Sequence, residues 1–246
     1  MIRTDLAAAF SLLTRLPVGW LFPAEAKVDQ ARAVWAYPLV GVVVGGIGAA
    51  VYAACHRLGL APALAALWAL AALILTTGGL HEDGLADSAD GFGGGRTRAR
   101  KLEIMKDSRI GSYGALALML SLALRAGAVA LIAEPQAVAL ALITAGALGR
   151  AAMLLPLRLL APARTDGLGA SVAGGPVPAA VLAAVAAIVL ALAFHPLSRA
   201  APMLACAALA GLAVSRLARL QIGGYTGDVL GASCVIAECL VLSLAA

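Results

Sequence analysis

Seven apolar stretches, each about as long as a membrane-spanning helix, dominate this sequence. A helix that crosses the hydrocarbon core of a bilayer needs about 20 apolar residues, because every backbone hydrogen bond must be made inside the segment. The candidate spans are residues 36–55, 61–80, 112–133, 136–157, 177–195, 200–218 and 228–245. We therefore expect an all-α fold, a polytopic transmembrane bundle of about seven spans, with residues 1–246 forming a single domain.

The composition excludes the other broad classes of protein. Hydrophobic residues make up 62% of the chain and charged residues only 13%, whereas soluble proteins carry about 25% charged residues. A water-soluble globule would lack polar surface, and a disordered chain would not be so apolar. The alternation of apolar and polar residues that a membrane β-barrel requires is also missing. Lipid therefore replaces water around most of the predicted exterior.

The lysines and arginines that lie outside the predicted spans or close to their ends indicate an orientation, because cytoplasmic loops hold the excess of these residues. With the N-terminus in the cytoplasm, the inner segments hold Arg3, Arg15, Lys27, Arg32, Arg96, Arg98, Arg100, Lys101, Lys106, Arg109, Arg158, Arg164, Arg216 and Arg219. The outer side holds Arg57 and Arg199. We attribute the net charge of +5 mainly to orientation, and we expect no nucleic-acid partner because aromatic residues do not interleave with the basic ones. We also expect no cleavable signal peptide.

Six of the thirteen acidic residues fall within residues 82–107. Asp83, Asp87 and Asp90 directly follow the second apolar stretch, and their spacing of four and three residues places them on one face of a helix. Like charges on one stripe repel each other unless a cation lies between them. Carboxylates without cysteine or paired histidine favour a hard ion such as Mg²⁺. We therefore predict a magnesium site here, with a solvated acidic helix end as the alternative.

A second acidic pair follows the glycine-rich turn at residues 93–95. Glu103 and Asp107 are four residues apart, so they share a helix face and can fold back opposite the first three carboxylates. We include both in the predicted metal set, which has room for one or two ions. Arg109 lies beside Asp107 and is suited to a bidentate grip on phosphate. The alternative is that the basic residues of this segment only set the orientation in the membrane.

Two arginines, Arg125 and Arg150, lie inside predicted spans. An arginine in lipid is costly, so each should face an internal cavity or a carboxylate partner. Arg150 lies nearer the inner end of its span, and we expect it to contact the substrate. The alternative is that both arginines are counter-ions that hold helices together.

The segment at residues 223–228 combines three glycines with Thr226 and Asp228 at the start of the last span. A tight loop here would let both side chains reach the acidic site, although a plain helix N-cap would have the same sequence. His81 stands just before the aspartate stripe. It is either a structural histidine or a phosphate contact.

Taken together, these motifs resemble the cobalamin synthase family, the adenosylcobinamide-GDP ribazoletransferases. The resemblance is carried by residues 10–17, 37–41, 78–91, 103–111 and 223–228, and so runs from near the N-terminus to the last span. Glu82 and Tyr225 depart from the expected pattern, so neither is assigned a role.

The resemblance implies a Mg²⁺-dependent, multi-pass enzyme of the bacterial inner membrane. In that family a hydroxyl of ribazole, or of ribazole 5′-phosphate, attacks the cobinamide-side phosphorus of adenosylcobinamide-GDP, and GMP leaves. The carried-over metal ligands are Asp83, Asp87, Asp90, Glu103 and Asp107, of which Asp107 and Asp90 are the expected catalytic residues. Asp107 would accept or orient the proton of the nucleophile. The expected substrate contacts are His81, Arg109, Arg150, Thr226 and Asp228, and a homo-oligomer is left open.

Three other readings compete with this one. Residues 87–91 match the opening of the CDP-alcohol phosphotransferase motif, and an intramembrane prenyltransferase would also bind Mg²⁺ and a diphosphate. The third is a cation-coupled transporter, whose carboxylates would line a path near the bilayer midplane. The acidic cluster lies at the ends of spans beside a basic loop, which favours an enzyme.

Overall fold

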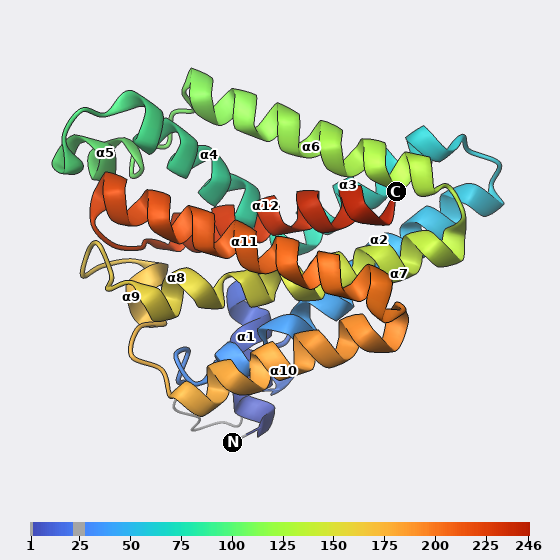
Figure 1. The fold of residues 1–246 in the computed structure, drawn as a ribbon, viewed down its shortest axis with the longest axis horizontal. Helices are drawn as coiled ribbons and strands as arrows, with labels where there is room; N and C mark the ends of the chain where they lie inside the picture. The colour runs from blue at the N-terminus through green and yellow to red at the C-terminus, as the bar shows by residue number, and fades with distance from the viewer. Residues whose placement is uncertain (1, 22–27) are drawn as a thin grey trace.

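The computed structural model describes residues 2–21 and 28–246, which form helices joined by short loops (Figure 1). The helices are α1 (Ile2–Leu13), α2 (Tyr37–Arg57), α3 (Pro62–Thr77), α4 (Leu80–Gly94), α5 (Arg98–Ile104), α6 (Ser112–Ile132), α7 (Pro135–Ala152), α8 (Leu154–Leu159), α9 (Leu168–Ser171), α10 (Val177–Phe194), α11 (Leu197–Ile222) and α12 (Gly227–Ala245). Two single 3₁₀ turns are η1 (Gly19–Leu21) and η2 (Ala33–Ala36). Lys27, one of the predicted inner cations, lies outside the described residues.

The expected membrane architecture is confirmed. Six helical segments of the described chain are long and apolar enough to cross a bilayer, and they are Ala33–Arg57, Ser112–Ile132, Pro135–Leu159, Val177–Phe194, Leu197–Ile222 and Gly227–Ala245. Each overlaps one of the predicted spans. A seventh crossing is obtained if the bent pair α3 and α4 is counted as one span.

The second predicted span, at residues 61–80, does not run straight to its end. Helix α3 stops at Thr77, and α4 leaves at 88° to it. Gly78 and Gly79 make the corner with φ angles of 67° and 71°, a left-handed conformation that glycine adopts without steric cost. The acidic residues of α4 are therefore turned out of the line of the apolar helix α3.

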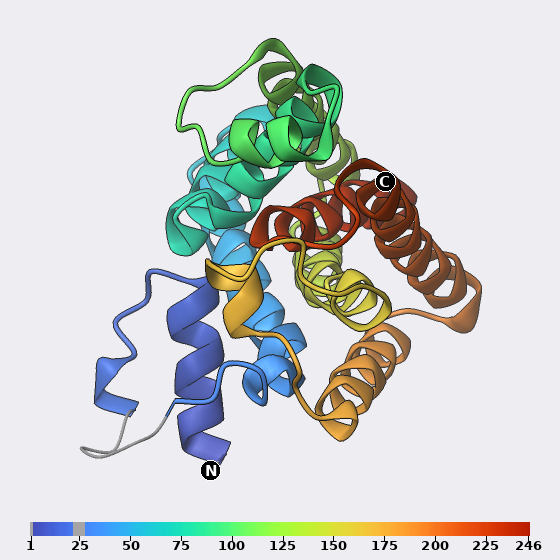
Figure 2. The same ribbon diagram turned by 90° about the vertical axis from the view of Figure 1, so that its left-hand side faces the viewer.

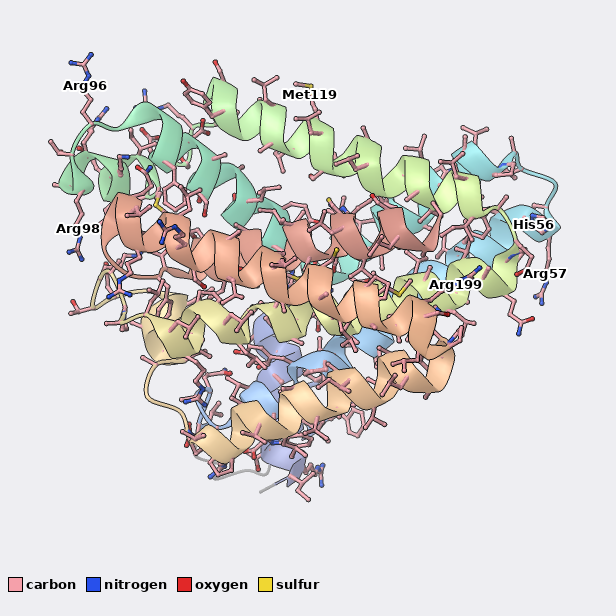
Figure 3. The ribbon with its side chains drawn as sticks, in the orientation of Figure 1. His56, Arg57, Arg96, Arg98, Met119 and Arg199 are labelled. Atoms are coloured by element: carbon pink, nitrogen blue, oxygen red, sulfur yellow. The ribbon has the colours of Figure 1, made fainter. Side chains whose placement is uncertain are left out.

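Small residues allow the spanning helices to pack closely. Lipid is as apolar as leucine, so helices in a membrane associate through tight packing rather than through exclusion of water. On α2, Gly41 touches the backbone of Gly146 on α7, and a side chain at Gly45 would meet the backbone of Leu142. Large apolar side chains face outward instead, as Met119 does on α6 (Figure 3).

The two ends of the bundle carry different sets of charged residues. Arg96 and Arg98 project from the end that holds α5, whereas Arg57 and Arg199 project from the opposite end (Figure 3). Figure 2 looks onto the first end, where the long helices are seen nearly along their axes and α1 lies across them. Of the predicted inner and outer arginines, Arg96 and Arg98 thus lie at the opposite end of the molecule from Arg57 and Arg199.

Candidate active site

The acidic helix α4 lies at the end of the bundle that also carries α5 and the first turn of α6 (Figure 1). Asp83 and Asp87 line a cleft of about 670 Å³, together with the glycine corner that starts the helix. Asp83 is exposed and Asp87 is half-buried. These two carboxylates therefore share one face, as the spacing predicted, and this face opens to the outside of the bundle.

Positive charge lines the same cleft. Arg15, from the segment after α1, and Lys106, from the loop after α5, both contribute to its wall. Lys106 also pairs with Asp166 at 2.7 Å. Sequence reasoning counted Arg15 among the inner cations and did not assign it to the site. A cleft with carboxylates and cations on its walls suits a ligand that brings both metal and phosphate.

Asp107 reaches this cleft from the loop after α5 and lies opposite the aspartates of α4. Its carboxylate is gripped by Arg109, with a distance of 2.6 Å between Oδ2 and Nη2. The side-chain hydrogen bonds from Arg109 lower the pKa of Asp107 to about 2. A group this acidic is a weak proton acceptor at neutral pH, so Asp107 is better suited to orient a hydroxyl or bind a cation.

Asp90, the third residue of the predicted stripe, has another place. Its side chain is 7% exposed, and its two oxygens accept hydrogen bonds from the backbone N–H groups of Gly111 at 2.7 Å and Gly114 at 2.9 Å. It thereby satisfies free N–H groups at the start of α6. Asp90 does not line the cleft of Asp83 and Asp87, but it holds the loop that carries Asp107.

Glu103 lies apart from the other carboxylates. Its side chain is 68% exposed and pairs with Arg100 on the same helix at 2.8 Å. Within residues 2–21 and 28–246, no three His, Cys, Asp or Glu side chains come together as a preformed metal centre. The structure thus does not gather the five expected ligands in one group, and it leaves Asp83, Asp87 and Asp107 around the cleft.

The start of α12 approaches α4 from the other side. Thr226 caps α12, because its Oγ1 accepts the N–H of Val229 at 3.4 Å and donates to Asp228 at 3.0 Å. Asp228 itself pairs with Arg164 at 3.2 Å. The N-cap alternative therefore describes Thr226, whereas Asp228 faces a pocket that it shares with Asp83.

A missing side chain permits this approach. A Cβ on Gly84 would lie 2.8 Å from the backbone oxygen of Asp228 and 2.9 Å from its Cα. The glycine after Asp83 therefore admits a neighbouring helix. Arg164 was counted only as an inner cation, and its partner lies 64 residues away.

Inside the bundle, four charged side chains form what we call the ionic cluster, namely Glu82, Arg125, Arg150 and Glu238. Arg125 bonds to Glu82 at 2.9 Å and to Glu238 at 3.0 Å, and Arg150 also bonds to Glu238. Both arginines are at most 2% exposed. The counter-ion alternative thus describes their contacts, and Arg150 lines no part of the acidic cleft. Sequence reasoning passed over Glu82, which joins α4 to this cluster.

His81 lies between the ionic cluster and the pocket at Asp228, and it lines the space on both sides. Its side chain is 3% exposed, and its Nε2 has no hydrogen-bond partner within the protein. A buried ring nitrogen without a partner is costly unless something else binds it. This free nitrogen favours the ligand-binding reading of His81 over the structural one.

This chain is similar to a known protein family over nearly its whole length. A family model described as cobalamin-5-phosphate synthase matches residues 5–246. A protein of Bradyrhizobium diazoefficiens named adenosylcobinamide-GDP ribazoletransferase is 53% identical over 246 residues, covering 100% of this chain and 94% of that protein. Proteins of the same name from Azorhizobium caulinodans (45% identical, 94% of this chain and 90% of that protein) and Mesorhizobium japonicum (43%, 99% and 93%) are also similar. No solved structure matches this chain.

Proposed function

This chain belongs to the cobalamin-5-phosphate synthase family, and from that premise we propose that it is an adenosylcobinamide-GDP ribazoletransferase that works with Mg²⁺ at the cleft of α4. A hydroxyl of ribazole, or of ribazole 5′-phosphate, attacks the cobinamide-side phosphorus of the pyrophosphate. A new P–O bond forms to the acceptor, the bond from that phosphorus to the bridging oxygen breaks, and GMP leaves. The hydroxyl proton passes to water or to the leaving phosphate. The product is adenosylcobalamin or its phosphate.

The observation that carries this proposal is the cleft lined by Asp83, Asp87 and Asp107 together with Arg15 and Lys106. Phosphoryl transfer needs little covalent help from an enzyme and depends on positioning and charge neutralisation. A pyrophosphate brings negative charge, which the two cations attract directly. The carboxylates repel it unless they bind a cation, so their presence in the same wall supports a metal-bound substrate.

The donor groups fit Mg²⁺. Asp83 and Asp87 offer hard carboxylate oxygens on one face, and Mg²⁺ in proteins is commonly held by one or two carboxylates with water and substrate phosphate. When bound there, Mg²⁺ would neutralise the pyrophosphate and make GMP a better leaving group. We assign Asp90 to positioning, because its oxygens are engaged by the start of α6. Glu103 is not needed in this scheme.

Other charged residues in and near the cleft bind and orient. Arg109 holds Asp107 in its ionised form, and the exposed guanidinium has further N–H groups for a phosphate oxygen. Arg15 and Lys106 attract the diphosphate from the wall of the cleft. Asp107, on the wall facing α4, orients the acceptor hydroxyl. Asp228 and His81 lie on the far side of α4, where we place the acceptor.

The arrangement in the membrane follows from the arginines at the two ends. The end with Arg96 and Arg98 faces the cytoplasm, and the end with Arg57 and Arg199 faces outward (Figure 3). We therefore propose that the N-terminus and the cleft lie on the cytoplasmic side of the bacterial inner membrane. Both proposed substrates carry polar phosphate or sugar groups, and they would reach the cleft from water while the spans lie in lipid.

The rival functions have less support. A transporter needs titratable groups along a path through the midplane, whereas the mid-span carboxylate Glu238 is bound by two arginines. A CDP-alcohol phosphotransferase would use similar chemistry on another substrate, and the family match favours the corrinoid.

Release of GMP tests the proposal. Purified protein in detergent is mixed with adenosylcobinamide-GDP and Mg²⁺, with and without ribazole. We expect GMP only when both Mg²⁺ and an acceptor are present, and a loss of at least about a hundredfold in Asp87→Asn, the range typical for groups that act on transition-state charge. Glu103→Gln is the matched control and should keep nearly full activity. Equal losses in both variants, or turnover without acceptor, would contradict the assignment.

A further inference from the structure

A second pocket, of about 160 Å³, lies on the side of α4 away from the wide cleft. Its walls come from α1, α2, the loop with α9, and α12. Most of the lining is apolar and includes Leu13, Tyr37, Met153, Val172 and Leu230. These side chains are almost completely buried, so the pocket has the character of a preformed site for a flat apolar group.

One end of this pocket is polar, and this end adjoins the acidic cleft. Asp83 lines both spaces, and so does Leu80. A molecule seated in the pocket would therefore have one end beside Asp83, within reach of whatever the cleft holds. The pocket and the cleft therefore adjoin each other at the carboxylate of Asp83.

The polar end contains buried atoms that lack partners. His81 Nε2 and Arg164 Nη1 have no hydrogen bond within the protein, and both residues line the pocket. Arg164 has its Nη2 on Asp228, so one edge of its guanidinium is free. Buried polar groups are nearly always satisfied, and these unsatisfied atoms point to a polar ligand group at this end.

We propose that this pocket binds the acceptor of the reaction, with its dimethylbenzimidazole ring among the apolar side chains and its ribose at Asp83. This inference rests on the proposed function. The fit is chemical, because ribazole joins a flat, nearly apolar ring to a polyhydroxylated sugar, which is the same division that the pocket shows. The ribose hydroxyls then face the cleft where the pyrophosphate is held.

The other parts of the substrates fit this pocket less well. The corrin ring is far larger than a space of about 160 Å³. Guanine is small enough, but its edge carries several hydrogen-bonding groups, and burying them among Leu13, Val172 and Met153 would leave them unsatisfied. The donor therefore stays in the open cleft, and the two substrates approach Asp83 from opposite sides of α4.

The test is to fill the pocket and measure each substrate separately. Val172→Phe enlarges a buried side chain on the pocket wall, and Leu168→Trp does so at an exposed position of the lining, where folding is less at risk. We expect KM for ribazole to rise by about tenfold or more, equivalent to about 1.4 kcal/mol, while KM for adenosylcobinamide-GDP stays unchanged. Val177→Phe, at an exposed position on α10, is the matched control and should change neither value.

The outcomes separate this inference from the proposed function. If the wild-type protein releases no GMP with either acceptor, the proposed function itself fails. If the wild type is active and Leu168→Trp leaves KM for ribazole unchanged, only the acceptor pocket is overturned, and this holds even if Val172→Phe does not fold. A rise in KM for the corrinoid instead of ribazole would also overturn it, because the pocket would then hold the donor.

Discussion

Arg125 of α6 donates a hydrogen bond of 2.9 Å to Glu82, the residue directly before Asp83 on α4. The same arginine bonds to Glu238 of α12 at 3.0 Å. Two helices of the bundle are thereby joined to the short helix that carries the acidic face. In an apolar surrounding, such pairs persist only when every charge has a partner, so this contact fixes where α4 lies.

Replacing Arg125 should lower the thermal stability of the protein far more than replacing an exposed arginine. In Arg125→Leu, Glu82 loses its arginine partner and Glu238 loses one of its two. Breaking a buried pair costs about 3–5 kcal/mol. Arg100→Leu is the control, because its pair with Glu103 is exposed and such pairs contribute little. The measurement is the midpoint of thermal unfolding in detergent. Equal midpoints for the two variants would show that the cluster does not hold α4.

Asp90→Ala should damage the protein through the loop that carries Asp107. The substitution leaves the N–H groups of Gly111 and Gly114 without an acceptor, and loss of such a cap costs about 0.5–2 kcal/mol. We expect lower kcat and lower stability, with no change in the Mg²⁺ concentration that gives half-maximal activity. Asp87→Asn should shift that concentration upward in whatever activity remains. A shift of similar size in Asp90→Ala would return Asp90 to the set of metal ligands.

Gly84→Ala should separate α4 from α12. The new methyl group would meet the backbone of Asp228 at 2.8–2.9 Å, which is closer than van der Waals contact allows, so one helix must move. Gly46→Ala is the matched change, because nothing lies within 4 Å of its Cβ position, and replacing a glycine within a helix favours the helix by about 0.5–1 kcal/mol. We expect lower activity and stability only in Gly84→Ala. Identical melting curves for Gly84→Ala and Gly46→Ala would contradict the close packing of α4 against α12.

Arg164→Gln should discriminate between the two acceptors. Its free Nη1 lies in the pocket that we assign to the acceptor, and a guanidinium binds phosphate strongly. We expect KM for ribazole 5′-phosphate to rise by about tenfold, whereas KM for ribazole changes little. Arg216→Gln, an exposed position on α11, is the control. Equal rises for both acceptors would mean that Arg164 acts through Asp228 and not on the phosphate.

The predicted orientation can be measured by chemical labelling. Cysteine is placed at Arg98 or at Arg199 in a variant that lacks Cys55, Cys206, Cys234 and Cys239, the four free cysteines of the described chain. A thiol reagent that cannot cross membranes should label the cysteine at position 199 in spheroplasts. It should label the one at position 98 only after the membrane is opened. The opposite pattern would place the acidic cleft outside the cell.

Most of the fold could be predicted because a membrane span is a local property. Length and hydropathy of a stretch decide whether it crosses a bilayer, and α6 at Ser112–Ile132 matches the expected 112–133 within one residue. The corner at Gly78 and Gly79 was harder to predict. Paired glycines are also common in straight transmembrane helices, so only the left-handed φ angles reveal the turn.

The site could be predicted only in part, because its partners lie far apart in the sequence. Helical spacing put Asp83 and Asp87 on one face, and the structure agrees. The same rule included Asp90, whose partners in the loop before α6 lie 21 and 24 residues away. Arg150 has its carboxylate 88 residues away. No local pattern encodes such contacts, which depend on how the helices pack.

Because of the corner made by Gly78 and Gly79, one continuous stretch of chain contacts lipid along α3 and water at the acidic face of α4. Helix α3 is almost entirely apolar, whereas α4, which starts three residues later, carries acidic side chains on a face that opens to water. An enzyme that is anchored in lipid can in this way keep one face of a charged helix open to water while the other face packs within the bundle. Water-borne substrates then reach the reacting groups from the side of the bundle end and leave by the same route, so the membrane acts as a support and not as a barrier to be crossed.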